Sequence, residues 1–117
     1  MKEKYKEFIN TFQKERDFFK CHEILEDIWI EETSCNTRKH VAINLLLISV
    51  GALHWKNKNF KGALKVFKNS LENYDDLKFE IEKIGVDSSK LKIIIEESLD
   101  KISLEENYNE IYLPLIQ

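Results

Sequence analysis

Residues that turn or break a chain are scarce in this sequence. Its 117 residues include three glycines and one proline, Pro114. Hairpins and sheet turns depend heavily on both residue types, so the scarcity argues against a β-rich fold. A chain of this length with 43% hydrophobic residues is expected to bury one core. We therefore expect an all-α single domain over residues 1–117.

Cysteines and long apolar runs are also few. Cys21 and Cys35 are the two cysteines, and residues 1–12 do not show a basic-then-apolar leader. This pattern is typical of a cytosolic protein with reduced thiols. The longest strongly apolar stretch, 41–55, is shorter than the roughly 20 residues that span a bilayer. We expect a cytoplasmic protein without a disulfide and without a membrane partner.

Basic charge is not in excess, since the formal net charge is −3. Proteins that bind nucleic acid by bulk electrostatics normally carry a basic excess, so nucleic acid is not the expected partner.

The charge is nevertheless unevenly distributed along the chain. The stretch 56–68 holds five lysines and no acid, which leaves −8 on the rest of the chain. Four of these lysines recur every three or four residues: Lys58, Lys61, Lys65 and Lys68. Such a stripe is typical of a solvated helix face, and the alternative is a docking surface for an acidic protein.

Apolar residues recur at helical spacing in most of the chain, which predicts a bundle of about five helices. The predicted helices cover residues up to about 16, 18–31, 41–56, 60–71 and 88–102. Asp17, Thr37 and Asp87 are positioned to cap the second, third and fifth of them. The alternation in 75–85 suits an extended segment while its Lys and Glu residues suit a helix, so both conformations stay open.

The third predicted helix, 41–56, is apolar nearly all round, which is typical of a buried central helix. Gly51 would allow a neighbouring helix to approach closely. The apolar stripe of the fourth helix then predicts an antiparallel pair with the third. The last residues, 111–117, are apolar and contain Pro114. We expect them to form an extended tail that packs back on the bundle.

Four titratable residues are the candidates for chemistry. His22 and Glu26 lie about 40° apart on the second helix and should touch, with Glu23 beside them. His54 projects from the end of the central helix, and antiparallel packing would bring it near the other three. Phe18 and Trp29, on the same face as His22, would form an apolar roof.

Three interpretations of this group remain. The favoured one is a structural network, in which carboxylates fix the imidazole tautomers and join two helices. A general acid–base enzyme at His22, Glu23, Glu26 and His54 is the alternative, because a carboxylate beside an imidazole in an apolar setting shifts proton affinities. A metal site is disfavoured because Glu26 stands where a zinc helix has its second histidine. We expect no metal and no cofactor, and whether the chain is an enzyme stays open.

Two motifs resemble a known bacterial family. The segment 18–29, Phe-Phe-Lys-Cys-His-Glu-Ile-Leu-Glu-Asp-Ile-Trp, is similar to a signature of the domain of unknown function 309 family, and 52–63 is similar to its second motif. The resemblance covers roughly residues 18–71 and implies a small all-helical domain without an assigned activity. The matching positions are His22, Glu23, Glu26, Trp29, His54, Gly62 and Ala63. The third and fourth helices also resemble one tetratricopeptide unit, on the residues Gly51, Ala63, Phe67, Ser70 and Leu71.

The function predicted from the sequence is that of a helical interaction or scaffold module. Trp55, beside a polar turn, is a candidate for lining a groove or a subunit contact. Ile24 and Ile28, on the outer flank of the second helix, also suggest a subunit contact, so we expect a homo-oligomer. An acidic protein that docks on the lysine stripe is the other predicted partner.

Overall fold

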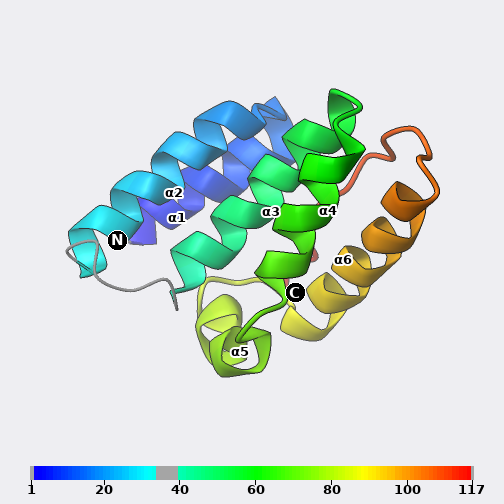
Figure 1. Cartoon of the computed structure of the whole chain (residues 1–117). Coiled ribbons are helices and arrows are strands. Elements are labelled where there is room, and N and C mark those ends of the chain that lie inside the picture. The colour runs from blue at the N-terminus through cyan, green and yellow to red at the C-terminus, as the bar shows by residue number, and fades with distance from the viewer. Residues whose placement is uncertain (1, 34–39, 117) are drawn as a thin grey trace.

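The computed structural model describes residues 2–33 and 40–116. Within these residues the chain forms six α-helices, and a π-helical turn extends the first of them (Figure 1). Their bounds are α1 Lys2–Asn10, η1 Thr11–Glu15, α2 Phe18–Thr33, α3 Val41–Lys56, α4 Phe60–Ser70, α5 Tyr74–Lys83 and α6 Ser88–Ser103. The radius of gyration is 13.2 Å, the value expected of a compact chain of about this length. The all-α prediction is confirmed.

Helix α3 lies at the centre, as its apolar composition predicted. In Figure 1, α2, α3 and α4 lie side by side, with α1 against α2 and α6 against α4. Helix α5 contacts α3 and α6 at one end of the molecule. Buried residues occur on several sides of α3, among them Leu45, Ile48 and Trp55. None of the helices in the described ranges is long and apolar enough to cross a membrane.

Two predicted helix caps are present. The Lys20 amide donates to the Asp17 carboxylate over 3.0 Å, and the Lys90 amide donates to Asp87 over 3.1 Å. Thr37, the predicted cap of the central helix, lies outside the described residues. Within them, His40 is the cap of α3, because its Nδ1 accepts a hydrogen bond from the Ala42 amide over 3.0 Å.

Helices α3 and α4 pack closely at Gly51. A Cβ atom at this position would lie 2.8 Å from the Phe67 ring, which is too close for van der Waals contact. Phe67 and Ala63 are fully buried in the same interface. The close approach predicted at Gly51 is therefore confirmed, and Phe67 is the residue that requires it.

Residues 74–83 form helix α5, so the bundle has one helix more than the five predicted. Tyr74, Leu77 and Ile81 are buried and share one helical face. Phe79, which produced the apparent alternation, is 71% exposed. An exposed aromatic residue beside a helical stripe imitates the two-residue period of a strand.

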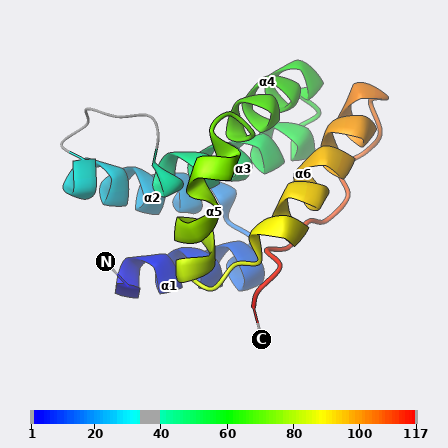
Figure 2. The same cartoon turned by 90° about the horizontal axis from the view of Figure 1, so that it is seen from below.

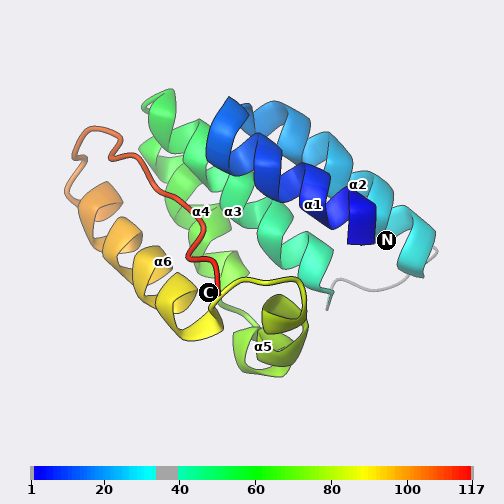
Figure 3. The same ribbon diagram turned by 180° about the vertical axis from the view of Figure 1, so that it is seen from behind.

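The chain leaves α6 after Ser103 and returns across the molecule toward α1 (Figures 2 and 3). Ile111 and Leu113 are buried along this path. Near its end the backbone pairs with the turn before α6. The Asp87 amide donates to the Pro114 carbonyl over 2.7 Å, and the Ile116 amide donates to the Gly85 carbonyl over 2.8 Å. In Figure 3 this segment runs between α6 and α1 and passes in front of α4.

Candidate functional site

His22 and Glu26 meet on α2, but at the surface. Nε2 of His22 lies 3.5 Å from Oε2 of Glu26, and the two side chains are 34% and 49% exposed. Glu23 beside them is exposed, and Phe19 places its ring 6.2 Å from that of His22. The prediction of a buried network is wrong for this pair, because water reaches both side chains. Nδ1 of His22 is nevertheless buried without a hydrogen-bond partner.

His54 belongs to a different set of contacts, at the turn between α3 and α4. Its Nδ1 lies 3.1 Å from Nδ2 of Asn59, and Oδ1 of Asn59 accepts a hydrogen bond from the Gly62 amide over 3.1 Å. Asn59 thereby caps α4, and His54 orients the cap. A Cβ at Gly62 would lie 2.7 Å from the Asn59 amide nitrogen, so glycine leaves room for this arrangement.

The four candidates are therefore not brought together as one group. Among the described residues, no hydrogen bond or ion pair joins His54 to His22, Glu23 or Glu26. Across the same residues, no three His, Cys, Asp or Glu side chains are placed to hold a metal ion. Cys21 is a free, buried thiol, and burial raises its pKa to about 12. A neutral buried thiol does not act as a nucleophile near neutral pH.

Three residues assigned to partner contacts lie inside the fold instead. Trp55 is 1% exposed, and its Nε1 donates to the Glu106 carbonyl over 2.9 Å. Its ring meets Tyr108 edge to face, with 5.2 Å between the centroids. Ile24 and Ile28 are also buried in the core. The predictions that placed these three residues in a groove or a subunit contact are wrong, because the chain buries all three in its own core.

The lysine stripe is exposed along its length. Lys61, Lys65 and Lys68 lie on α4, and Lys58 lies in the preceding turn with a φ of 63°. The opposite face of α4 is buried at Ala63, Phe67 and Ser70, so the lysines point away from the core. No ion pair joins any of the four to an acidic residue of the described part of the chain. We call Lys58, Lys61, Lys65 and Lys68 the lysine face.

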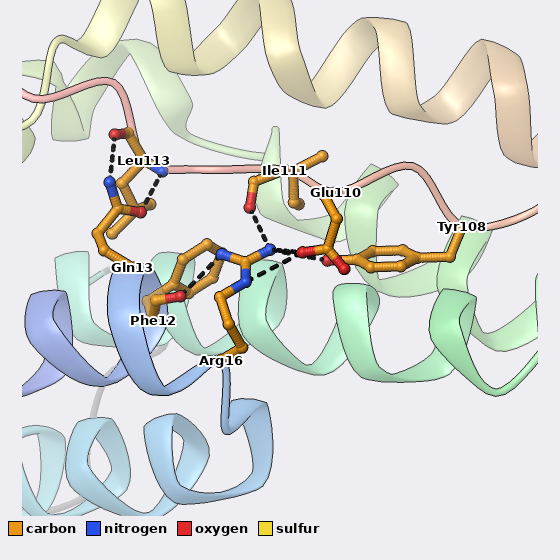
Figure 4. A network of polar contacts seen from close by, with 7 residues as sticks. All are labelled: Phe12, Gln13, Arg16, Tyr108, Glu110, Ile111 and Leu113. Carbon is orange, nitrogen blue, oxygen red and sulfur yellow. Dashed lines mark hydrogen bonds and ion pairs between the residues drawn. The ribbon is translucent and has the colours of Figure 1, made fainter.

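A polar network that the sequence did not reveal surrounds Arg16. The guanidinium donates to the carbonyls of Phe12 and Ile111 over 2.8 Å each, and to the Tyr108 hydroxyl over 3.2 Å (Figure 4). It also pairs with the Glu110 carboxylate. The Tyr112 ring lies 4.1 Å from the guanidinium carbon. Arg16 thus joins the end of the first helix to a segment more than 90 residues away in the chain.

Gln13 completes this network one helical turn earlier. Its amide nitrogen donates to the Leu113 carbonyl over 3.0 Å, and its amide oxygen accepts from the Leu113 amide over 2.7 Å (Figure 4). We call Gln13 and Arg16, with residues 108–113, the tail clamp. One signal in the sequence was available: Arg16 is one of only two arginines among 18 basic residues and stands between Phe12 and Phe18. Arginine is preferred over lysine where a forked donor and an aromatic face are both needed.

Comparison with known proteins finds a family but no assigned function. The sequence model of a family described as a domain of unknown function (DUF309) matches residues 5–66. A protein of Bacillus subtilis strain 168, described as the uncharacterized protein YpuF, is 28% identical over 111 residues. That match covers 95% of this chain and 63% of the relative, so the chain spans less than two thirds of the relative's length. No solved structure matches the chain.

Proposed function

This chain belongs to the family of domains of unknown function 309, and we propose that it is a helical interaction module whose docking surface is the lysine face. The observation that supports the proposal is that the lysines of the lysine face are exposed and that none forms an ion pair with an acidic residue of the described part of the chain. Surface lysines that only keep a helix soluble are commonly interspersed with acids. Here the acids lie elsewhere, which leaves a concentrated positive surface on an acidic chain.

The lysine face stands on a rigid support. Phe67 anchors α4 against Gly51, and Asn59 caps its first turn. At the other end of α4, the side-chain amide nitrogen of the buried Asn44 donates to the Ser70 carbonyl over 2.6 Å. A charged surface that is already in place loses little conformational freedom when a partner binds. These contacts favour docking of a preformed face over folding of the face on binding.

An acidic protein is the partner that this chemistry fits best. The ammonium groups of Lys61, Lys65 and Lys68, at helical spacing on α4, match carboxylates spaced along a partner helix or an acidic segment. Nucleic acid is the weaker candidate, because the chain outside residues 56–68 carries a net charge of −8 and would repel a long polyanion beyond the lysine face.

The experiment is photo-crosslinking in cells with a reactive amino acid at position 65, and the control places it at Glu96 on α6. We expect an acidic protein to be captured at position 65 and not at position 96. The double variant Lys61→Glu with Lys65→Glu should weaken the purified complex at least about tenfold, since two attractions become repulsions. Raising the salt from about 50 to 200 mM should weaken the complex of the parent protein.

The matched control is Lys14→Glu with Lys90→Glu, which makes the same change in net charge at two exposed lysines away from α4. This control should bind as the parent does, and both double variants should melt within a few degrees of it. Equal binding by the two double variants would remove the lysine face from consideration. Capture of RNA, or only of a second copy of this chain, would replace the proposed partner.

A further inference from the structure

A second surface feature lies away from the lysine face, where α1, α3 and α5 meet the end of α2. A cleft of about 500 Å³ opens there, large enough for a small organic molecule. Its polar lining comes from Tyr5, Glu32, His40, Asp76, Glu80 and Lys83. Val41, Leu77 and Ile84 form an apolar wall. None of these residues belongs to the His22–Glu26 pair or to the tail clamp.

Tyr5 supplies the observation that a ligand would explain. The residue is 7% exposed, and its hydroxyl oxygen is buried without a hydrogen-bond partner. A buried unpaired hydroxyl destabilises the folded chain, so such groups are rare in structures. Tyr74 shows the usual arrangement, since its buried hydroxyl donates to the Ser88 carbonyl over 2.5 Å. Burial, with Glu32 nearby, raises the pKa of Tyr5, so its hydroxyl stays neutral and can donate or accept.

The charge of the lining selects the sign of the ligand. Glu32, Asp76 and Glu80 bring three carboxylates, whereas Lys83 brings one ammonium. Nδ1 of His40 accepts the hydrogen bond that caps α3, so this ring nitrogen carries no proton. Among the described lining residues, carboxylates therefore outnumber ammonium groups beside the apolar wall, which disfavours an anion and favours a cation with an apolar part.

The same hydrogen bonds disfavour a metal ion in this role. With Nδ1 of His40 accepting, the proton lies on Nε2, which meets Oε1 of Glu32 at 2.8 Å. The imidazole then has no lone pair to offer to a metal. We propose that the cleft binds a small organic cation, an ammonium group on a short apolar stem, with Tyr5 and Glu80 as its polar contacts.

The test is calorimetric titration of the purified protein with n-pentylamine at pH 7.5, where the amine is protonated. Pentanoate and 1-pentanol serve as the anionic and neutral probes of matched length. We expect n-pentylamine to bind with a Kd on the order of a millimolar, as suits so small a ligand, and to bind at least about tenfold more tightly than either matched probe. Equal binding of the three probes, or no binding of the amine, would overturn the proposal.

Two variants separate binding from folding. Tyr5→Phe should raise the melting temperature of the free protein, because it removes the unpaired hydroxyl, and should weaken amine binding about fivefold. Glu80→Gln should weaken binding by at least as much, whereas Glu96→Gln on α6 should not. Tyr74→Phe should lower the melting temperature and leave binding unchanged. Undiminished binding in both Tyr5→Phe and Glu80→Gln would sink the proposal.

Discussion

The α3–α4 pair and the tail clamp both bury aromatic side chains, but they do so by different means. In the pair, Phe67 packs on Gly51, and the contact is apolar and close in sequence. In the tail clamp, Arg16 and Gln13 hold residues that lie 92 to 100 positions away, through hydrogen bonds to backbone and side-chain oxygens. Trp55 and Phe18 then lie beneath Tyr108.

The comparison predicts different effects of mutation on an apolar contact and on a hydrogen-bonded one. Apolar packing sums many weak contacts, so a lost side chain leaves a cavity and weakens the whole core. The clamp depends on a few oriented donors, so a change of geometry at one of them should release one segment. Three substitutions test this difference, from the largest expected effect to the smallest, and a fourth, in an exposed pair outside both regions, sets the lower end of the scale.

Phe67→Ala should have the largest effect, lowering the free energy of unfolding by about 3–5 kcal/mol. The ring is fully buried, and Gly51 cannot fill the space that it leaves. Urea denaturation followed by circular dichroism measures the loss. A loss below about 1 kcal/mol would show that the α3–α4 pair does not contribute more to the free energy of unfolding than the tail clamp.

Arg16→Lys should have an intermediate and local effect. Lysine keeps the charge but cannot reach Phe12, Ile111 and Glu110 with one forked group, at a cost of about 1–3 kcal/mol. Hydrogen exchange should quicken in residues 108–113 while α3 keeps its protection. Uniform quickening across the whole chain would contradict a separate clamp.

Gln13→Glu should weaken the clamp in a pH-dependent way. At pH 7 its carboxylate would still accept from the Leu113 amide but would face the Leu113 carbonyl with a negative oxygen, at a cost of about 1–2 kcal/mol. The fold would favour the protonated acid, so its pKa should be raised. The stability difference from the parent should then be largest at neutral pH, should shrink as the pH falls through the raised pKa toward about 4, and should be smallest below the unfolded-state pKa of about 4.3.

Melting curves of Gln13→Glu and of the parent at matched pH values measure this difference. Gln13→Met is the control, because it keeps the length without either hydrogen bond and should show no recovery in acid. A difference that did not change with pH would show that the contact with Leu113 is not the cause.

Glu26→Ala should have the smallest effect, within about 0.5 kcal/mol, because exposed ion pairs contribute little. A buried pair would instead lose about 1–3 kcal/mol, because the remaining partner would lack its hydrogen bond. Thermal melts of Glu26→Ala and His22→Ala decide between these values. A large loss in either variant would restore the structural network.

The pair was largely predictable from the sequence, and the clamp was not. Apolar periodicity identified α3 and α4, and the glycine at position 51 indicated a close approach. Periodicity shows which face of a helix is apolar, but it does not show what covers that face. For this reason Trp55, Ile24 and Ile28 were assigned to partner contacts, although the chain itself covers them.

The candidate chemistry was predicted less well than the fold. The spacing of His22 and Glu26 correctly placed them in contact, yet spacing does not report solvent exposure. His54 was grouped with them, although Asn59, five residues later, is its partner. His40 was missed as a helix cap because hydroxyl and carboxyl side chains are the usual caps. Tyr5 was not a candidate, because its unpaired hydroxyl is visible only in the folded chain.

The length of chain between the two sides of the clamp has a consequence for folding. Contacts across 92 to 100 residues close a large loop, whereas α3 and α4 meet within a short stretch. We expect the clamp to form after the rate-limiting step, since local helix pairs can nucleate without it. During synthesis, Phe18 and Trp55 would then emerge long before Tyr108 arrives to cover them. Arg16→Lys should accordingly speed unfolding while leaving the refolding rate nearly unchanged, and slower refolding would place the clamp in the folding nucleus.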